Sequence, residues 1–336
     1  MNIKKCAILF LALLCVLPIF AADEGGGGKD YIKWVDFDIP SAVLEDAKNT
    51  DIETYSNVEV PHVSWIEILS SLGAKYGGNF KLYKKSDIEF IVSEVTSKIS
   101  DKISSSEIVR EYTKNKKLYD YYIRAYGAVL SGMLGKHTEF RKEDDVFISE
   151  EKYGMTAYSP IAENYYYSHF DDFGAARSYG YSRPHLGHDL LGSVGTPIIA
   201  IEGGYVSACG WNQYGGWRIG ITSFDGCRYY YYAHLRKDHP YNDIYKGKIV
   251  NAGEVIGYLG MTGYSKKENV NNIDTPHLHF GLQIIFDKSQ KDGANQIWID
   301  LYQLTNFLSK SKTSVSKAKN GEYESTQYKV RNDTPD

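Results

Sequence analysis

Apolar residues in the first half of the chain recur every three or four positions, the spacing of one helix face. Two of these stripes follow a capping-box pattern, a serine with a glutamate three positions later. Glycines stand where the first and last stripes end. The pattern predicts three amphipathic helices, over residues 64–76, 86–99 and 118–133. We assign them to a helical domain of unknown role over residues 30–150.

From about residue 152 the pattern changes to short β-branched and aromatic runs separated by glycines. These runs predict strands over residues 197–201, 205–208, 217–222, 229–233, 255–259 and 277–286. Tyr229 to Tyr232 alternate in direction along their strand, so two rings should point to each face. A last helix follows, and the polar stretch 311–336 is predicted to be a disordered tail. The fold class is therefore α+β, an all-helical domain followed by a mainly antiparallel β domain over residues 151–310.

The N-terminus has the pattern of an export signal. Two lysines precede an apolar run over residues 6–20, and two alanines follow where a signal peptidase requires small residues. We predict a cleavable signal peptide over residues 1–22, a glycine-rich linker over 23–29, and a secreted, periplasmic or cell-envelope location. An uncleaved anchor is the alternative, although the run is shorter than the roughly 20 residues that span a membrane. A lipoprotein signal at Cys15 is weaker, because the leucine before it is bulky.

Composition narrows the classes of partner. With 336 residues, 43% apolar and 24% charged, the chain can bury a sizeable core. Its formal charge of -4 offers no overall positive field for phosphate backbones, so we exclude nucleic acid. We expect a monomer with no membrane contact beyond the signal segment. Cys209 and Cys227 lie at opposite ends of a predicted meander, so no disulfide is expected between them.

Histidines gather in the β domain. Six of the nine fall within 95 residues of this domain, at positions 185, 188, 234, 239, 277 and 279. His185 and Asp189 are four residues apart, whereas His277 and His279 are two apart, a spacing that puts both rings on one face of a strand. Two nitrogens and one oxygen from such a set would bind zinc and leave its fourth position for water. Each pattern alone is weak, but their conjunction favours a catalytic zinc site.

The β half resembles the lysostaphin-type, or LytM-type, zinc endopeptidases, which cut peptide bonds in bacterial peptidoglycan. Five motifs stand in the family's order: RPHLGHD at 183–189, GTPIIAIEGGYV at 195–206, YAHL at 232–235, KGKIVNAGEVIGYLGMTG at 246–263 and PHLHF at 276–280. The resemblance covers roughly residues 180–286 and leaves the helical half uncovered. It implies a compact antiparallel domain of two facing sheets, a barrel or sandwich like a duplicated hybrid motif, with the metal in an open groove.

The resemblance also implies roles for five residues. His185, Asp189 and His279 would bind one zinc ion, and His234 and His277 would stay off the metal beside its water. Zinc lowers the pKa of bound water to about 7, so hydroxide is available at neutral pH. The chain has no H-E-x-x-H motif, so the two histidines replace a glutamate base. We expect His277 to be the general base and His234 the transition-state stabiliser or proton donor, with their division of roles open.

Two features depart from the family pattern. His188 precedes Asp189 where the family commonly has an uncharged residue, which makes it a competing ligand or a partner of a ligand; we expect it outside the metal site. The stretch 264–275 is longer than the usual link between two motifs, so we expect it to reshape one wall of the groove. Substrate choice is therefore open.

The predicted function is an exported zinc metalloendopeptidase that hydrolyses peptide bonds in peptidoglycan stems or cross-bridges. The alternative is a non-catalytic LytM-like module that binds the cell wall or activates a separate amidase. Such modules lack ligands or catalytic histidines, whereas all five positions are filled here. A carbohydrate phosphotransfer domain fits poorly with export, because its phosphate donors are cytoplasmic. An inhibitory lid, a wall-binding module and a scaffold remain alternatives for the helical domain.

Overall fold

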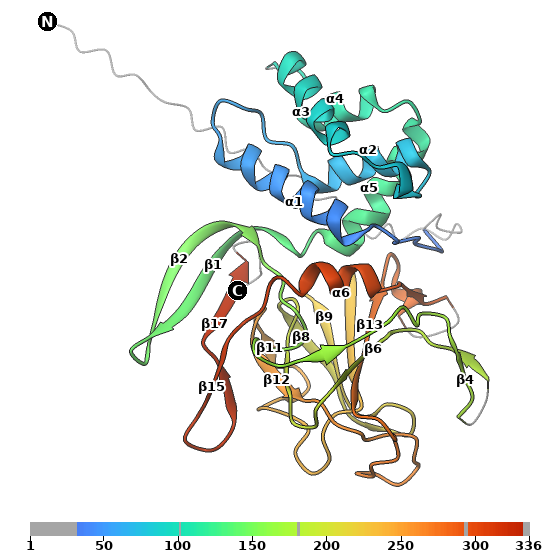
Figure 1. The fold of residues 1–336 in the computed structure, drawn as a ribbon, viewed down its shortest axis with the longest axis vertical. Helices are drawn as coiled ribbons and strands as arrows, with labels where there is room; N and C mark the ends of the chain where they lie inside the picture. The colour runs from blue at the N-terminus through green and yellow to red at the C-terminus, as the bar shows by residue number, and fades with distance from the viewer. Residues whose placement is uncertain (1–31, 101, 180–181, 292–294, 332–336) are drawn as a thin grey trace, which may run out of the picture. The chain divides into compact units, whose positions relative to one another are not determined.

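A computed structural model describes residues 32–100, 102–179, 182–291 and 295–331. The predicted signal peptide and linker lie outside these residues. The expected order, helices followed by an antiparallel β domain, is confirmed (Figure 1). No helix in the described ranges is long and apolar enough to cross a membrane.

The helical region contains five α-helices. They are α1 Ser41–Ser56, α2 Trp65–Tyr76, α3 Ser86–Lys98, α4 Ser105–Tyr112 and α5 Lys116–Leu130. The side chain of Ser64 caps α2 by accepting the N–H of Ile66, and Gly77 ends that helix with a φ of 62°. The capping box predicted at Ser86 is wrong, because Ser86 is already helical and no side chain caps α3. Helices α1 and α4 were not predicted; the buried face of α1 includes Asp51 and Thr54, which interrupt its apolar stripe.

Two polar segments form strands that the sequence did not indicate. After α5 the chain makes a hairpin of β1 Leu134–Glu143 and β2 Val146–Met155, which begins inside the range 30–150 expected to be helical and extends beyond it. Its two-residue turn, Asp144 and Asp145, has positive φ at both positions, as a type I′ turn requires.

The C-terminal stretch differs from the predicted disordered tail. It forms β15 Val315–Lys317, β16 Tyr323–Ser325 and β17 Gln327–Arg331. Strand β17 pairs with β1, and the ring of Tyr328 stacks on Phe140 at 4.8 Å. Strand β17 therefore forms because it pairs with β1, which is distant in the sequence, and not because its own residues are hydrophobic.

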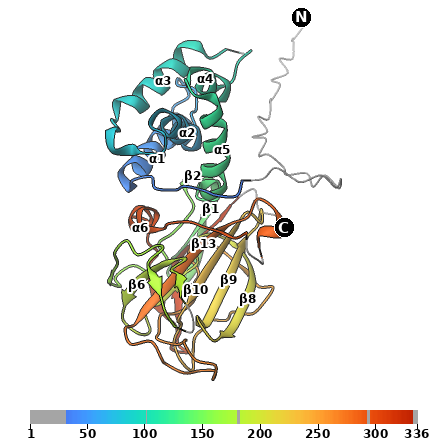
Figure 2. The ribbon, with the colours of Figure 1, turned by 90° about the vertical axis from the view of Figure 1, so that its right-hand side faces the viewer.

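One large antiparallel sheet forms the centre of the β domain. Its strand order is β11 Ile249–Val250, β8 Gly204–Asn212, β9 Gly216–Ser223, β10 Arg228–Ala233, β13 His277–Ile284, β6 His188–Gly192 and β3 Tyr167–Ser168. Strand β14 Ile297–Trp298 pairs with β13. A smaller sheet pairs β7 Pro197–Ile199 with β12 Val255–Tyr258, and both sheets contribute to one buried cluster. Figure 2 shows β8, β9, β10 and β13 side by side. Cys209 and Cys227, the two cysteines within the described residues, are free, as expected.

A buried arginine joins the helical region to the large sheet. Arg228 of β10 is 1% exposed and donates to both carboxylate oxygens of Glu202, at 2.7 and 2.9 Å. It also donates to the Ala128 carbonyl and the Ser131 hydroxyl at the end of α5, at 3.0 and 2.9 Å. At Gly132 a Cβ would lie 1.8 Å from a Glu202 oxygen, so only glycine fits this close approach. Helix α6 Tyr302–Leu308 adds a second junction by contacting α1.

We predict that Arg228→Met lowers the free energy of unfolding by about 3–5 kcal/mol, because it leaves the Glu202 carboxylate buried without its cation. Urea unfolding followed by circular dichroism measures this change. The control is Arg124→Met, at an exposed position of α5, which should stay within about 0.5 kcal/mol. Equal stability of the two variants would show that the buried pair does not hold the regions together.

Candidate metal centre and groove

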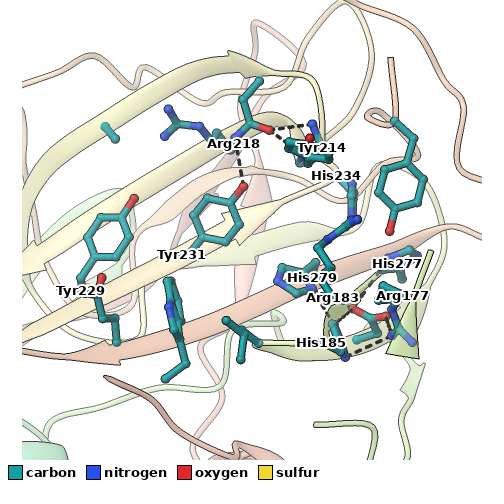
Figure 3. Close-up of a pocket in the computed structure, with 18 of the residues that line it drawn as sticks. Arg177, Arg183, His185, Tyr214, Arg218, Tyr229, Tyr231, His234, His277 and His279 are labelled. Atoms are coloured by element: carbon teal, nitrogen blue, oxygen red, sulfur yellow. Dashed lines mark hydrogen bonds and ion pairs between the residues drawn. The ribbon is translucent and has the colours of Figure 1, made fainter. Parts of the chain in front are cut away.

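The pairing of β6 with β13 brings two predicted ligands together. His279 lies directly opposite Asp189 in this antiparallel pair, so both side chains share one face. His185 reaches them from the loop between β5 Arg183–Pro184 and β6 (Figure 3). His188 precedes Asp189 on the same strand and is fully buried, outside this group.

Three donor atoms converge at this point. His185 Nε2 lies 2.8 Å from His279 Nδ1 and 3.1 Å from Asp189 Oδ1. His279 Nδ1 lies 3.0 Å from the same carboxylate oxygen. Zinc takes nitrogen and oxygen ligands at about 2.0–2.1 Å, which places the ligand atoms of a tetrahedron about 3.3 Å apart. The donor set and its spacing therefore fit a zinc ion.

A buried carboxylate orients His185 toward this point. His185 Nδ1 lies 3.1 Å from Asp172 Oδ2 and 3.0 Å from the Asp172 carbonyl oxygen. In the neutral ring, the form that binds a metal, a proton on Nδ1 satisfies these acceptors and leaves the lone pair of Nε2 facing Asp189 and His279. The other oxygen of Asp172 lies 3.1 Å from His188 Nδ1, and His188 Nε2 lies 2.7 Å from His169 Nδ1. His188 is thus a partner of the carboxylate that holds His185.

An arginine neutralises part of the negative charge. Arg177, from β4 Ala176–Arg177, donates to Asp189 Oδ2 at 2.8 Å and to Asp172 Oδ2 at 3.2 Å. Its Nη2 also lies 3.1 Å from His185 Nδ1. Because both of those nitrogens are donors in this tautomer, the approach is a contact and not a hydrogen bond.

The charges of the site favour a cation. Burial raises the pKa of Asp189, but hydrogen bonds from His185 and His279 outweigh it and hold this pKa well below its usual range. Burial lowers the pKa of His185, but hydrogen bonds to Asp172 and Asp189 outweigh this effect and raise the pKa to about 9. The carboxylates therefore stay ionised and stabilise positive charge between them.

His234 and His277 lie beside the three donor residues, with their ring centres 4.8 Å apart. Each Nδ1 is 2.8 Å from a backbone carbonyl oxygen, that of Thr262 for His234 and that of Thr275 for His277. In the neutral rings these bonds place the proton on Nδ1 and the lone pair on Nε2. Both histidines can therefore accept a proton at Nε2.

The position of His234 is tightly constrained. Its φ is 61°, in the left-handed region, and a Cβ at Gly263 would lie 2.9 Å from its Nδ1. Burial, followed by the charges of His277 and His279, holds the pKa of His234 well below its usual range. His234 is therefore a neutral ring at pH 7.

A groove of about 880 Å³ runs past these residues. Tyr229 and Tyr231 of β10 line it, whereas Tyr230 and Tyr232 are buried on the opposite face, so the predicted alternation is confirmed. Tyr229 lies across Gly220, where a Cβ would come 2.2 Å from its hydroxyl oxygen. The absence of a side chain at this glycine makes room for the aromatic floor.

The long stretch 264–275 forms part of the groove wall, as expected. It contributes Tyr264, Asn272, Ile273 and Asp274 to the lining. Asn269 fixes the loop, because its Oδ1 accepts the Trp217 Nε1–H and the Asp238 backbone N–H, each at 2.9 Å.

The structure thus brings together all five residues singled out in the sequence. Sequence reasoning missed Asp172, Arg177 and His169. They lie upstream of the first family motif and have no periodic spacing. The only available signal was a second group of charged and imidazole side chains shortly before His185.

Comparisons with known proteins place the region that contains the five predicted site residues within a peptidase family match. Residues 183–293 match peptidase family M23. The L-Ala--D-Glu endopeptidase of Bacillus subtilis (strain 168) is 33% identical over 175 residues, 49% of this chain and 52% of the relative. Lysostaphin of Staphylococcus staphylolyticus is 41% identical over 97 residues, 29% of this chain and 18% of the relative.

Among solved structures, a LytM protein from Ruminococcus gnavus ATCC 29149 shares the fold, with a TM-score of 0.51 and 20% identity. The match covers 84% of this chain and 92% of that one. The chain spans about half the length of the Bacillus relative and less of lysostaphin. The M23 match, the relatives and the His-Asp-His group together show that the β domain of this chain is similar to peptidase family M23, and to its lysostaphin- and LytM-like members, over residues 183–293.

Proposed function

We propose that this protein is an exported, zinc-dependent endopeptidase that hydrolyses peptide bonds in bacterial peptidoglycan. The observation that carries the proposal is the convergence of His185, Asp189 and His279 within 3.1 Å of one another, beside His234 and His277. The names of the relatives, an L-Ala--D-Glu endopeptidase and lysostaphin, support this substrate class.

In the proposed mechanism His185, Asp189 and His279 would hold one zinc ion. When bound there, zinc would supply a water of lowered pKa and would polarise the scissile carbonyl. Asp172 fixes the tautomer of His185, and Arg177 donates a hydrogen bond to Asp189 Oδ2 and offsets its negative charge. The protein's part is to orient the donors and to handle protons.

The surroundings of the two further histidines support His277 as the general base. His277 Nε2 lies 3.8 Å from Asp189 Oδ1, and that carboxylate stabilises the imidazolium which forms when His277 accepts a proton. Burial disfavours the same charge on His234. The Nδ1–H of His234 donates to the Thr262 carbonyl oxygen. His234 can therefore donate to a developing oxyanion only after its Nε2 has gained a proton.

Export rests on the N-terminal pattern. We propose that residues 1–22 are a cleaved signal peptide, that 23–29 are a linker, and that the mature chain acts as a monomer in the cell envelope or outside the cell. The helical region contributes no residue to the described lining of the groove, which comes from residues 177–298. A scaffold role for this region is therefore favoured over a lid.

We predict that His279→Ala loses bound zinc, whereas His277→Ala keeps it and loses the ability to clear peptidoglycan. Elemental analysis of the mature chain gives the zinc content, and turbidity of purified peptidoglycan gives activity. His239→Ala is the matched control, because His239 pairs with Glu322 and lies outside the metal site. A chelator should abolish the activity of the unaltered chain, and added zinc should restore it.

Other results would change the account. Unaltered protein that binds no zinc and clears no wall preparation would refute the endopeptidase, and wall binding or activation of an amidase would replace it. Full zinc content in His279→Ala would refute the ligand assignment alone.

We predict that Asp172→Asn lowers zinc affinity about 10- to 100-fold, because His185 loses the carboxylate that orients it. Competition with a chromophoric chelator measures the affinity without relying on catalysis. The control is Asp171→Asn, the neighbouring exposed residue, which should leave the affinity unchanged. If both variants bind zinc equally tightly, Asp172 does not position the ligand.

A further inference from the structure

One arginine of the groove has an N–H without an acceptor. Arg218 of β9 is half-buried and lines the groove. Its Nε is buried and has no hydrogen-bond partner among the described residues. Leaving a buried donor unsatisfied costs free energy unless a ligand supplies an acceptor. By contrast, buried Arg228 has acceptors on Glu202 and at the end of α5.

The charge of the groove is opposite to that of the whole chain. Its described lining includes the cations Arg177, Arg183, Arg218, Lys246 and Lys291, and the acids Asp189 and Asp274. With five cations and two acids, the described lining carries more positive than negative side chains. In a chain of formal charge -4, this excess produces a local field that attracts anions.

Neighbouring side chains fix the surface that a ligand would cross. Figure 3 shows Arg218 on the far side of Tyr231 from His279 and His185. The Tyr231 hydroxyl lies 3.3 Å from Asn212 Nδ2, and Asn212 Oδ1 accepts the backbone N–H of Gly215 at 2.6 Å. An extended ligand that reaches from the metal centre to Arg218 therefore passes over an ordered aromatic floor.

We propose that Arg218 binds a carboxylate of the substrate, so that the groove selects acidic peptides over neutral ones. The planar guanidinium matches a carboxylate with two parallel hydrogen bonds, and a carboxylate would satisfy the buried Nε. A peptide made of glycine residues has no charged side chain that could reach Arg218. This inference rests on the proposed function, because it names the class of peptide that the same groove accepts.

The test compares two tetrapeptides of sequence Ala-Glu-Lys-Ala and Ala-Gln-Lys-Ala, with the second residue in the D form and both ends blocked. Calorimetry with the zinc-loaded mature chain carrying His277→Ala measures binding. We expect the glutamate peptide to bind roughly tenfold more tightly. Adding Arg218→Gln should remove this preference, whereas Arg124→Gln on exposed α5 should preserve it.

Equal affinity for the two peptides, or a preference that survives Arg218→Gln, would overturn the proposal. If Arg218→Gln fails to fold, Arg218→Lys replaces it; this variant keeps the charge but not the planar fork, so a reduced preference is expected and an unchanged one refutes the role of Arg218. Cleavage is measured separately with His277 intact. If the chain does not cleave but the binding preference remains, the endopeptidase function is refuted and the carboxylate site is not. If the chain cleaves but shows no binding preference, the carboxylate site is refuted and the endopeptidase function is not.

Discussion

The site depends on the register of β6 against β13. Strand β13 is central in its sheet, and its Leu278 and Phe280 are buried under the surface that presents His277 and His279. A slip of one residue in β6 would turn Asp189 away and bring His188 to the groove face. The apolar alternation of β13 therefore fixes which imidazoles and which carboxylate meet.

Next to the β6–β13 pair, the fold places two negatively charged carboxylates in a mostly buried site. Two carboxylates, Asp172 and Asp189, lie on either side of the His185 ring, at 3.1 Å from its two nitrogens. Such an arrangement persists only because each oxygen has a hydrogen-bonded or cationic partner, Arg177 among them. Some of these interactions also orient the His185 ring. The contacts that offset the cost of burying the two carboxylates therefore also place the nitrogen and oxygen atoms that could bind a metal.

The sequence predicted what local spacing determines. A two-residue spacing put His277 and His279 on one face, and alternation separated the groove tyrosines from the buried ones. Asp172 was beyond such reasoning, because it meets His185 through a loop of irregular structure. The tail strand β17 was missed for a related reason: its order comes from pairing with β1, far away in sequence. Helix α1 was not predicted because its buried face includes the polar residue Asp51. The Asp51 carboxylate accepts the backbone N–H of Trp65 and pairs with the His62 ring, and an apolar pattern cannot show such contacts.

Strand β10 connects the two halves of the molecule with the groove. On one face Arg228 and Tyr230 bind Glu202, and Arg228 reaches the end of α5; on the other face Tyr229 and Tyr231 form the groove floor. Any change that loosens the Arg228 junction therefore acts on the backbone that carries these rings. None of the described groove lining comes from the helical region, so Arg228 joins this region to the strand that carries the groove tyrosines while the groove itself is formed by the β domain.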